Sequence, residues 1–379
     1  MTKVSISGLG MTAFGKHEDR SLKALLMDAC VEALKEANFP KIDAVYIGNF
    51  MSGSLGNQEI LGAIVANDLG LGPIPTVKVE GACASGGIAF RQAYLNVLNG
   101  VYEHVLVAGV EKMKHASTEE TTRAINAAMD NDSNEKNAGL TFPGFFGNLA
   151  NRYFYETGAS KKHLAMVALK NREYALGNPL AQFKKPTSIE EIMSARMITE
   201  PLGLFDCSPT TDGAAAIVLS KGENGVVVRS SAQASGTTQM QESVELLSIP
   251  AIRESANKAY ELAGLGPNDI DVVELHDCFS MTEVLAIEEL GFFDKGRGWE
   301  AVEQGLTKHG GKVPVNTSGG LLSKGHPIGA TGLAQIYQVV SQLRGTSCNQ
   351  VDNARIGLAQ NLGGTGAYST VHIFEKVGS

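Results

Sequence analysis

The chain has 379 residues, of which 43% are apolar and 19% charged, and its formal net charge is −8. This length predicts two or three domain-sized units, and the acidic balance argues against nucleic acid or an anionic membrane as the main partner. No window approaches the run of about 18 apolar residues that a membrane-spanning helix needs. The five cysteines are scattered, without CxxC or His-rich spacing, so we expect no disulfide framework, no metal site and a reducing cytoplasm.

The N-terminal stretch "MTKVSISGLG" predicts a first strand and a turn, and it lacks the pattern of a signal peptide. Later segments repeat a common plan of helices followed by strands. Three pairs of segments read alike in the same order: 22–49 with 251–278, 86–100 with 331–345, and 212–220 with 364–374. This order favours a duplicated α/β half over the alternative that any two α/β segments look alike.

The repeats divide the chain into a first half, 1–118 resuming at 200–222, and a second half, 223–379. The segment between them, 119–199, is polar at first, then aromatic and basic, and it predicts an inserted lid over a site. Its residues Phe142, Phe145 and Phe146 either line an acyl pocket or anchor the lid. Both halves alternate strands with helices of 10–15 residues, which predicts mostly parallel sheets with ligands at the carboxyl ends of the strands.

A lone cysteine, Cys83, lies at such a strand end in "VEGACASGGIAF" (79–90), where a predicted helix begins. The N-terminus of a helix lowers the pKa of a thiol, and the small neighbours allow a carbonyl group to approach closely. Free backbone N–H groups there stabilise an oxyanion. The pattern suits a nucleophile, although a buried structural cysteine gives the same sequence.

The segment "VELHDCFSMTEVLAIEELGF" (273–292) places His276 and Cys278 between a strand end and a helix start. Ser280 and Glu283 have the spacing of a capping box for that helix. In "NTSGGLLSKGHPIGATG" (316–332), Pro327 holds His326 extended among glycines, so His326 suits the base that activates Cys83. The fourth stretch, "AQNLGGTGAYSTV" (359–371), predicts a tight glycine turn that enters a strand.

Taken together, these motifs resemble those of the thiolase superfamily over the whole chain. The cysteine of "GACASGG", then "HDCF", "GHPIGATG" and the closing glycine turn have the family's order and approximate spacing. "HDCF" resembles the sterol-carrier-protein-type and archaeal-type members. The resemblance implies two similar βαβαβαββ halves in a layered α-β-α-β-α core, with a loop domain inserted in the first half. Ordinary thiolases have a catalytic cysteine where this chain has Asn361, and in the HDCF subgroup Cys278 takes that role.

The mechanism that the resemblance implies uses five residues. His326 helps deprotonate Cys83, which attacks a 3-ketoacyl-CoA, while the backbone N–H groups of Cys83 and Gly363 hold the oxyanion. The acetyl-CoA enolate that leaves is stabilised by His276 and His326, and Cys278 returns its proton. Coenzyme A then takes the acyl group from Cys83, and the reverse reaction is a Claisen condensation. Coenzyme A is thus a co-substrate, and no permanently bound cofactor is expected.

Basic residues in the insert are candidates for binding the phosphates of coenzyme A. Seven cations stand against three glutamates in residues 157–199. Among them we select Lys184, Lys185 and Arg196, with a solvated surface as the alternative reading of each.

Two other functions remain open on the sequence. The first is a condensing enzyme of the same fold, such as a ketoacyl or hydroxymethylglutaryl-CoA synthase, and the second is a non-catalytic CoA-binding subunit. Family members form dimers or tetramers, so a homo-oligomer is expected. The resemblance also permits a small zinc-bearing OB-fold partner. Acetoacetyl, longer or branched, and aromatic 3-ketoacyl groups all fit the motifs.

Overall fold

The computed structural model describes residues 3–378, and within that span the chain forms a mixed α/β fold. The strands are β1 (Val4–Met11), β2 (Ala44–Gly48), β3 (Thr76–Val79), β4 (His104–Glu111), β5 (Met197–Thr199), β6 (Leu202–Gly203), β7 (Gly213–Lys221), β8 (Val226–Ser235), β9 (Val272–Glu274), β10 (Ile356–Gly363) and β11 (Tyr368–Lys376). All of them except the β5–β6 pair belong to a single large sheet.

Helices connect and cover these strands. They are α1 (Leu22–Glu36), α2 (Ser52–Gly56), α3 (Leu61–Asp68), α4 (Ser85–Leu98), α5 (Thr118–Asn126), α6 (Asn134–Asn137), α7 (Phe142–Thr157), α8 (Lys161–Leu176), α9 (Ile189–Ser194), α10 (Pro250–Ala263), α11 (Ser280–Glu289), α12 (Gly298–Glu303) and α13 (Thr331–Arg344). Six short helical turns are η1 (Ala82–Ala84), η2 (Leu204–Asp206), η3 (Met240–Glu242), η4 (Pro267–Asp269), the π-helical η5 (Gly320–Lys324) and η6 (Ile328–Ala330). None of the helices in residues 3–378 combines the length and the apolar composition that crossing a membrane requires.

The large sheet consists of two similar halves, in the strand order β3-β2-β4-β7-β1-β8-β11-β10-β9. The halves join where β1 meets β8, at the register pair Ser5 and Val227. Counted outward from this junction, β1, β7, β4 and β2 have the same places as β8, β11, β10 and β9. Beyond β9, an isolated parallel bridge at Val315 takes the place that β3 has in the first half. This symmetry confirms the predicted duplication.

The prediction of mostly parallel sheets is wrong, because the sheet is mixed. β2 runs parallel to β3 and β4, and β9 runs parallel to β10, as strands joined by a covering helix do. In contrast, β7 lies antiparallel between β1 and β4, and β11 lies antiparallel between β8 and β10. β11 follows β10 after a tight turn, and β7 follows β4 only after the long segment 112–212. The alternation of helices and strands in the sequence does not show that these two strands run antiparallel to their neighbours.

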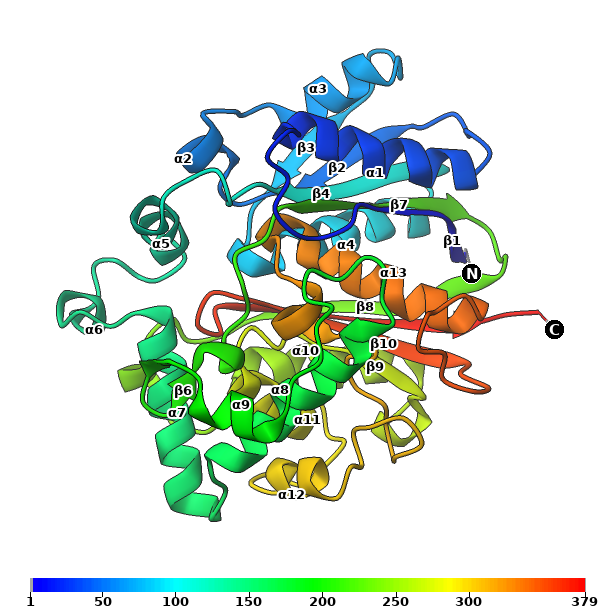
Figure 1. The fold of residues 1–379 in the computed structure, drawn as a ribbon. Helices are drawn as coiled ribbons and strands as arrows, with labels where there is room; N and C mark the ends of the chain where they lie inside the picture. The colour runs from blue at the N-terminus through cyan, green and yellow to red at the C-terminus, as the bar shows by residue number, and fades with distance from the viewer. Residues whose placement is uncertain (1–2, 379) are drawn as a thin grey trace.

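The elements stack in five layers, as Figure 1 shows. α1 covers one half of the sheet from outside, α10 covers the other, and α4 and α13 pack between the halves. The close contact of α1 with β1 depends on glycine. A Cβ atom on Gly8 or Gly10 would lie 2.0 Å from the carbonyl oxygen of Ala33 or Ala29. Here the abundant glycines bring backbones together rather than provide flexibility.

The segment 119–199 carries α5 to α9, and its apolar side chains join the core of the second half. Phe146 is fully buried and stacks on Phe279, with ring centroids 4.7 Å apart. Phe145 packs in the same core, whereas Phe142 lies on the wall of a cavity described below. Phe145 and Phe146 thus anchor the insert in the core, and Phe142, which belongs to the same core, also faces the cavity; whether that cavity is an acyl pocket stays a prediction.

Candidate active site

Cys83 lies in the tight turn η1 between the end of β3 and the start of α4, as the sequence pattern predicts. The turn is held by Ser85, whose hydroxyl donates to the Ala82 carbonyl at 2.6 Å and accepts from the Gly81 N–H at 3.0 Å. Ala82 has a φ of 51°, in the left-handed region that non-glycine residues seldom adopt. The chain thus holds the thiol in a fixed and strained turn.

Residues from distant parts of the chain meet at Cys83. Its sulfur and one ring nitrogen each of His276 and His326 all lie within 4.8 Å of one another. The two imidazole rings stand edge to face, with centroids 5.0 Å apart and planes at 86°. Zinc binds this kind of donor set as well, so the expectation of a site without metal remains a prediction.

A cavity of about 240 Å³ opens at this meeting point, and Cys83, Cys278 and His326 all line it. Its other walls come mainly from apolar side chains: Met113, Ile125, Phe142, Pro143, Ile198, Phe279 and Ile328. A mainly apolar cavity beside a thiol can accommodate an acyl group.

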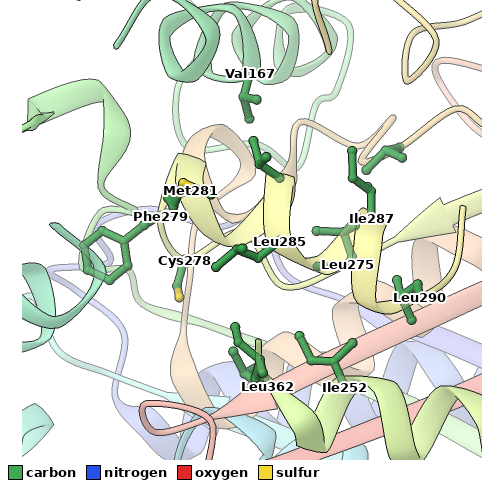
Figure 2. Packing of buried hydrophobic residues seen from close by; sticks show 14 of the residues in the cluster. Val167, Ile252, Leu275, Cys278, Phe279, Met281, Leu285, Ile287, Leu290 and Leu362 are labelled. Atoms are coloured by element: carbon green, nitrogen blue, oxygen red, sulfur yellow. The ribbon is translucent and has the colours of Figure 1, made fainter. Parts of the chain in front are cut away.

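Cys278 follows β9 and precedes α11, and Figure 2 shows it among the apolar side chains Phe279, Leu285 and Leu362. Its sulfur lies 3.6 Å from the hydroxyl of Thr282. Burial, and to a lesser extent the nearby Cys83, raises the pKa of this thiol. Cys278 is therefore protonated in the resting protein and has a proton to give.

The expectation that the start of α4 lowers the pKa of Cys83 is wrong for the resting protein. Burial raises the pKa of the Cys83 thiol to about 12, although hydrogen bonds from the backbone N–H groups of Gly364 and Cys83 lower it in part. Desolvation outweighs these backbone N–H groups because the thiolate loses its water. Cys83 needs a base to become a nucleophile.

His326 is placed to be that base. Burial lowers its pKa to about 3, so its ring is neutral and able to accept a proton. Its Nδ1 lies 2.6 Å from the Thr331 hydroxyl, which in turn donates to the Pro327 carbonyl at 3.1 Å. The hydroxyl has only one hydrogen, so we assign the Nδ1 proton to His326 itself. The lone pair of the ring is then on Nε2.

His276 contacts a residue that the sequence marked only as a departure from the family pattern. The side-chain Nδ2 of Asn361 lies 3.0 Å from the His276 Nδ1. Burial and the neighbouring His326 lower the pKa of His276, so this ring is neutral as well. No local pattern in the sequence indicates this contact, because the two residues are 85 positions apart.

The glycine turn after β10 packs against the turn that carries Cys83, and Gly364 lines the same cavity as the thiol. The backbone N–H of Gly364, one residue after Gly363, lowers the pKa of the Cys83 thiol in part. Gly363 instead permits a close approach, since a Cβ there would lie 2.3 Å from the Gly81 carbonyl oxygen. Gly363 thus allows the two turns to pack closely, and Gly364 provides an N–H that favours the Cys83 thiolate.

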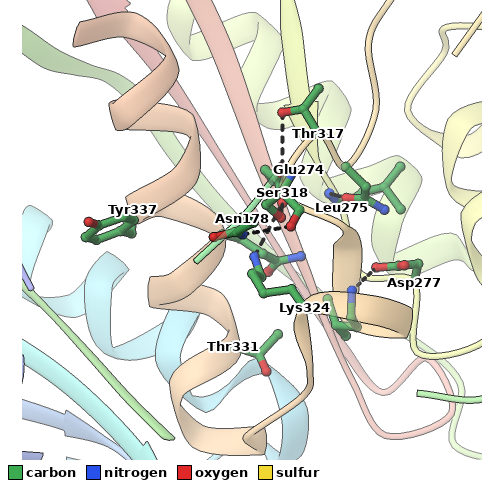
Figure 3. Close-up of polar contacts among 12 residues, drawn as sticks. Asn178, Glu274, Leu275, Asp277, Thr317, Ser318, Lys324, Thr331 and Tyr337 are labelled. Carbon is green, nitrogen blue, oxygen red and sulfur yellow. Dashed lines mark hydrogen bonds and ion pairs between the residues drawn. The ribbon is translucent and has the colours of Figure 1, made fainter. Parts of the chain in front are cut away.

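Buried polar contacts join the segment that includes Glu274 and Asp277 to the segment that includes Ser318 and Lys324, as Figure 3 shows. Glu274 accepts from the Ser318 hydroxyl and pairs with Lys324 at 3.5 Å. Asp277 accepts from the Leu321 N–H at 2.7 Å, at the start of the π-helical turn that leads to His326. The segments that carry His276 and His326 are thereby joined to each other.

The predicted capping box at the start of α11 is wrong. Ser280 is the first residue of the helix, and its hydroxyl donates to Asp206 at 2.6 Å. Glu283 accepts from the Lys170 ammonium at 2.6 Å instead of bonding the helix backbone. Both side chains are fully buried, so partners from other segments satisfy them.

A second cavity, of about 580 Å³, adjoins the first and shares Cys207, Ser208 and Pro209 with it. Lys184 and Lys185 line it, as does Arg172, whose guanidinium lies over the rings of Phe183 and Phe205 at 4.4 and 5.1 Å. Arg196 is exposed and is not among the lining residues. Of the three cations selected from the sequence, the structure brings two together.

The whole chain is similar to known proteins. A model of the thiolase N-terminal domain matches residues 4–223, and a model of a thiolase C-terminal domain-like region matches residues 232–376. A protein named acetyl-CoA acetyltransferase from Methanothermobacter thermautotrophicus is 42% identical, covering 99% of this chain and 100% of its own. The benzoylsuccinyl-CoA thiolase subunit BbsB of Thauera aromatica is 37% identical, covering 90% and 89%.

Solved structures have the same fold. The Ltp2-ChsH2(DUF35) aldolase matches with a TM-score of 0.86 and 26% identity, covering 99% of this chain and 98% of the other. Human mitochondrial 3-ketoacyl-CoA thiolase matches with a TM-score of 0.77 and 16% identity, covering 100% and 99%.

Proposed function

The chain belongs to the thiolase family, and on that premise we propose how its residues carry out acyl transfer. The chain is an acyltransferase that cleaves a 3-ketoacyl-CoA with coenzyme A, or condenses two acyl-CoA molecules in reverse, through an acyl-cysteine intermediate. The observation that carries the residue roles is the meeting of Cys83, His276 and His326 beside a cavity that Cys278 also lines.

The first step joins the acyl group to Cys83. His326 Nε2 takes the thiol proton as the sulfur attacks the 3-keto carbon, because the neutral ring presents a lone pair there. The oxyanion that forms is held by the backbone N–H groups of Cys83 and of the glycine turn, and the N–H groups of Cys83 and Gly364 already favour the thiolate. Within that turn we propose Gly363, which the sequence pattern selected, and the adjacent Gly364 as donors.

In the second step the bond between C2 and C3 of the substrate breaks. The oxyanion collapses to a thioester on Cys83, and the electron pair of the broken bond forms the enolate of acetyl-CoA. His276 and protonated His326 donate hydrogen bonds to the enolate oxygen. Cys278 protonates the enolate carbon, and its raised pKa keeps it protonated until then. Acetyl-CoA leaves.

The third step regenerates the enzyme. The Cys278 thiolate accepts the proton of an incoming coenzyme A thiol, whose sulfur attacks the Cys83 thioester. The new acyl-CoA departs, and Cys83 recovers its proton from His326. Each atom and proton is thus returned, and all steps can run backwards.

The second cavity is where we place the nucleotide end of coenzyme A. It adjoins the first cavity, and it has three cations: Lys184 and Lys185, which were selected from the sequence, and Arg172, one of the seven cations of residues 157–199 that was not selected. A diphosphate and a 3′-phosphate favour such a cluster, and the half-buried rings of Phe183 and Phe205 line the same cavity. Arg196 is not part of this proposal.

Several wider expectations remain proposals. We propose a cytoplasmic homo-oligomer divided as 1–118 with 200–222, 119–199, and 223–379; the two sheet halves and the limits of the matched family models support that division. A small zinc-bearing OB-fold partner is supported by the similar aldolase structure, whose name includes a DUF35 component. The apolar wall with Phe142 supports acyl groups larger than acetoacetyl.

Trapping the intermediate tests the proposal. Acetoacetyl-CoA supplied without free coenzyme A is expected to leave an acetyl group on Cys83 and to release acetyl-CoA, both seen by mass spectrometry of a digest. Cys83→Ala must abolish the adduct and thiolysis together. Thiolysis that persists in Cys83→Ala rules the proposal out. A loss of thiolysis in Cys278→Ala further separates a thiolase from a decarboxylating synthase of the same fold.

A further inference from the structure

Asn361 is a buried residue of β10 that lies between the first turns of α4 and α13. Its side-chain oxygen accepts from the Gly87 N–H at 3.3 Å, and its nitrogen lies 3.0 Å from His276 Nδ1. A Cβ atom on Gly332 would lie 2.3 Å from this oxygen, and one on Gly87 would lie 3.1 Å away. The two glycines leave a slot that the amide fills.

The orientation of this amide follows from its partners. A backbone N–H can only donate, so the atom that faces Gly87 is the oxygen of Asn361. The amide nitrogen therefore faces the imidazole ring, and it can only donate as well. It follows that Nδ1 of His276 accepts and carries no hydrogen. The neutral ring then has its proton on Nε2.

His326 has the opposite tautomer. Its Nδ1 proton is directed to the Thr331 hydroxyl, and its Nε2 has the lone pair. The two neutral rings, edge to face at 5.0 Å, thus offer one acceptor and one donor to the same small space. The proposed reaction needs both at once, a base for the Cys83 thiol and a donor for the enolate oxygen.

We propose that Asn361 is a positioning residue that fixes His276 as the Nε2–H tautomer, so that His276 donates to the enolate oxygen while His326 acts as base. This inference rests on the proposed function for its role in turnover. The tautomer itself is a property of the resting protein and is measured without substrate.

A neighbouring contact fixes the backbone of the same histidine. The Gln360 side-chain oxygen accepts from the His276 N–H at 3.0 Å, and the Gln360 carbonyl accepts from the Gln335 side chain at 2.8 Å. Consecutive residues of β10 thus hold both the main chain and the ring of His276. Gln335 touches neither, which makes it a suitable control.

The direct test is a long-range ¹H–¹⁵N spectrum of the imidazole nitrogens in the wild-type protein without substrate. The signals of His276 are assigned by their loss in His276→Gln. We expect a protonated Nε2 and an unprotonated Nδ1. A protonated Nδ1 with a bare Nε2 overturns the proposal, whether or not any variant folds.

Two variants of matched size test the consequence. Asn361→Asp places a carboxylate oxygen, which can only accept a hydrogen bond, opposite the Nδ1 of His276, and Asn361→Leu removes the hydrogen bond to Nδ1. We expect each to lower kcat about 10²-fold, the usual effect of losing one oxyanion donor. KM for the 3-ketoacyl-CoA stays nearly constant, since Asn361 does not touch substrate.

The pH profile separates the two variants. In Asn361→Asp the new carboxylate favours a doubly protonated ring, which again carries Nε2–H, so kcat recovers relative to wild type as the pH falls. In Asn361→Leu no such recovery is expected. Gln335→Leu controls for lost stability and should keep kcat and the tautomer.

Two outcomes contradict the role of Asn361: wild-type kcat in both variants, or a loss no larger than in Gln335→Leu. Failure of the proposed function can be told apart from failure of this inference. If no acyl-Cys83 adduct forms, Asn361 has no role in turnover, but the imidazole spectrum still tests the tautomer of His276.

Discussion

The carboxylate of Asp277 accepts a hydrogen bond of 2.7 Å from the backbone N–H of Leu321. It also accepts from the Leu322 N–H at 3.3 Å and from the Asn171 side chain at 2.8 Å. One aspartate beside two proposed catalytic residues thereby holds the turn that leads to His326. Burial and the nearby Glu283 raise the pKa of Asp277 well above its usual value.

Replacing Asp277 should weaken both the fold and the site. Asp277→Ala leaves buried donors without a partner, and we expect the free energy of unfolding to fall by about 2 kcal/mol. Asp277→Asn keeps an acceptor for the Leu321 N–H, so it should lose less. Urea unfolding followed by circular dichroism measures both, and an Asp277→Ala protein as stable as wild type contradicts the prediction.

Removing the second thiol should stop carbon–carbon cleavage. We expect Cys278→Ala to lower kcat for thiolysis by about 10²–10⁴-fold, the range for loss of a general acid or base. Alkylation of Cys83 by iodoacetamide should persist, because Cys83 and His326 remain. Cys348→Ala, in a loop away from the cavity, is the matched control. Near-normal thiolysis in Cys278→Ala would show that another group returns the proton.

The raised pKa of Cys83 predicts how its reactivity depends on pH in the free protein. With a pKa of about 12, the thiolate fraction increases about tenfold for each pH unit between 7 and 10. The rate of alkylation by iodoacetamide, measured by mass spectrometry of the peptide that contains Cys83, should therefore rise without a plateau in this range. A plateau near neutral pH would mean that the thiolate is already formed at rest, as the helix-end argument alone predicts.

Reversing charge in the second cavity should weaken binding of coenzyme A. We expect the double variant Lys184→Glu and Lys185→Glu to raise KM for coenzyme A several-fold, with kcat changed little, since neither lysine lines the cavity that holds Cys83. The effect should shrink at high salt because the lysines are exposed to screening. Lys162→Glu reverses one charge outside this cavity, as each single variant at Lys184 or Lys185 does inside it, and serves as the control for those single variants. An equal rise of KM for coenzyme A in the control and in the cavity variants would mean that overall charge, not this cavity, affects binding, and would contradict the prediction.

Much of the candidate site could be predicted from the sequence because each proposed catalytic group lies in a short, recognisable setting. Cys83 follows a strand and precedes a helix, and His276, Cys278 and His326 stand in motifs whose order identified the family and its duplicated fold. The sequence also located the insert and two of the three cations in the second cavity. Such features depend on neighbours within a few residues, and local patterns record them.

Contacts between distant segments were decided only by the tertiary structure. Burial raised the pKa of Cys83 although backbone N–H groups lowered it in part, since desolvation depends on what covers the sulfur. The Asn361 side chain lies next to the His276 ring, and Arg172 rather than Arg196 lines the cavity with Lys184. Ser280 donates to Asp206 instead of capping its helix. The antiparallel direction of β7 and β11 is a further feature that only the tertiary structure shows. The sequence by itself determined which chemical groups are present and on which elements they lie; packing determined their protonation, their partners and their direction, because those depend on long-range contacts and on the exclusion of water.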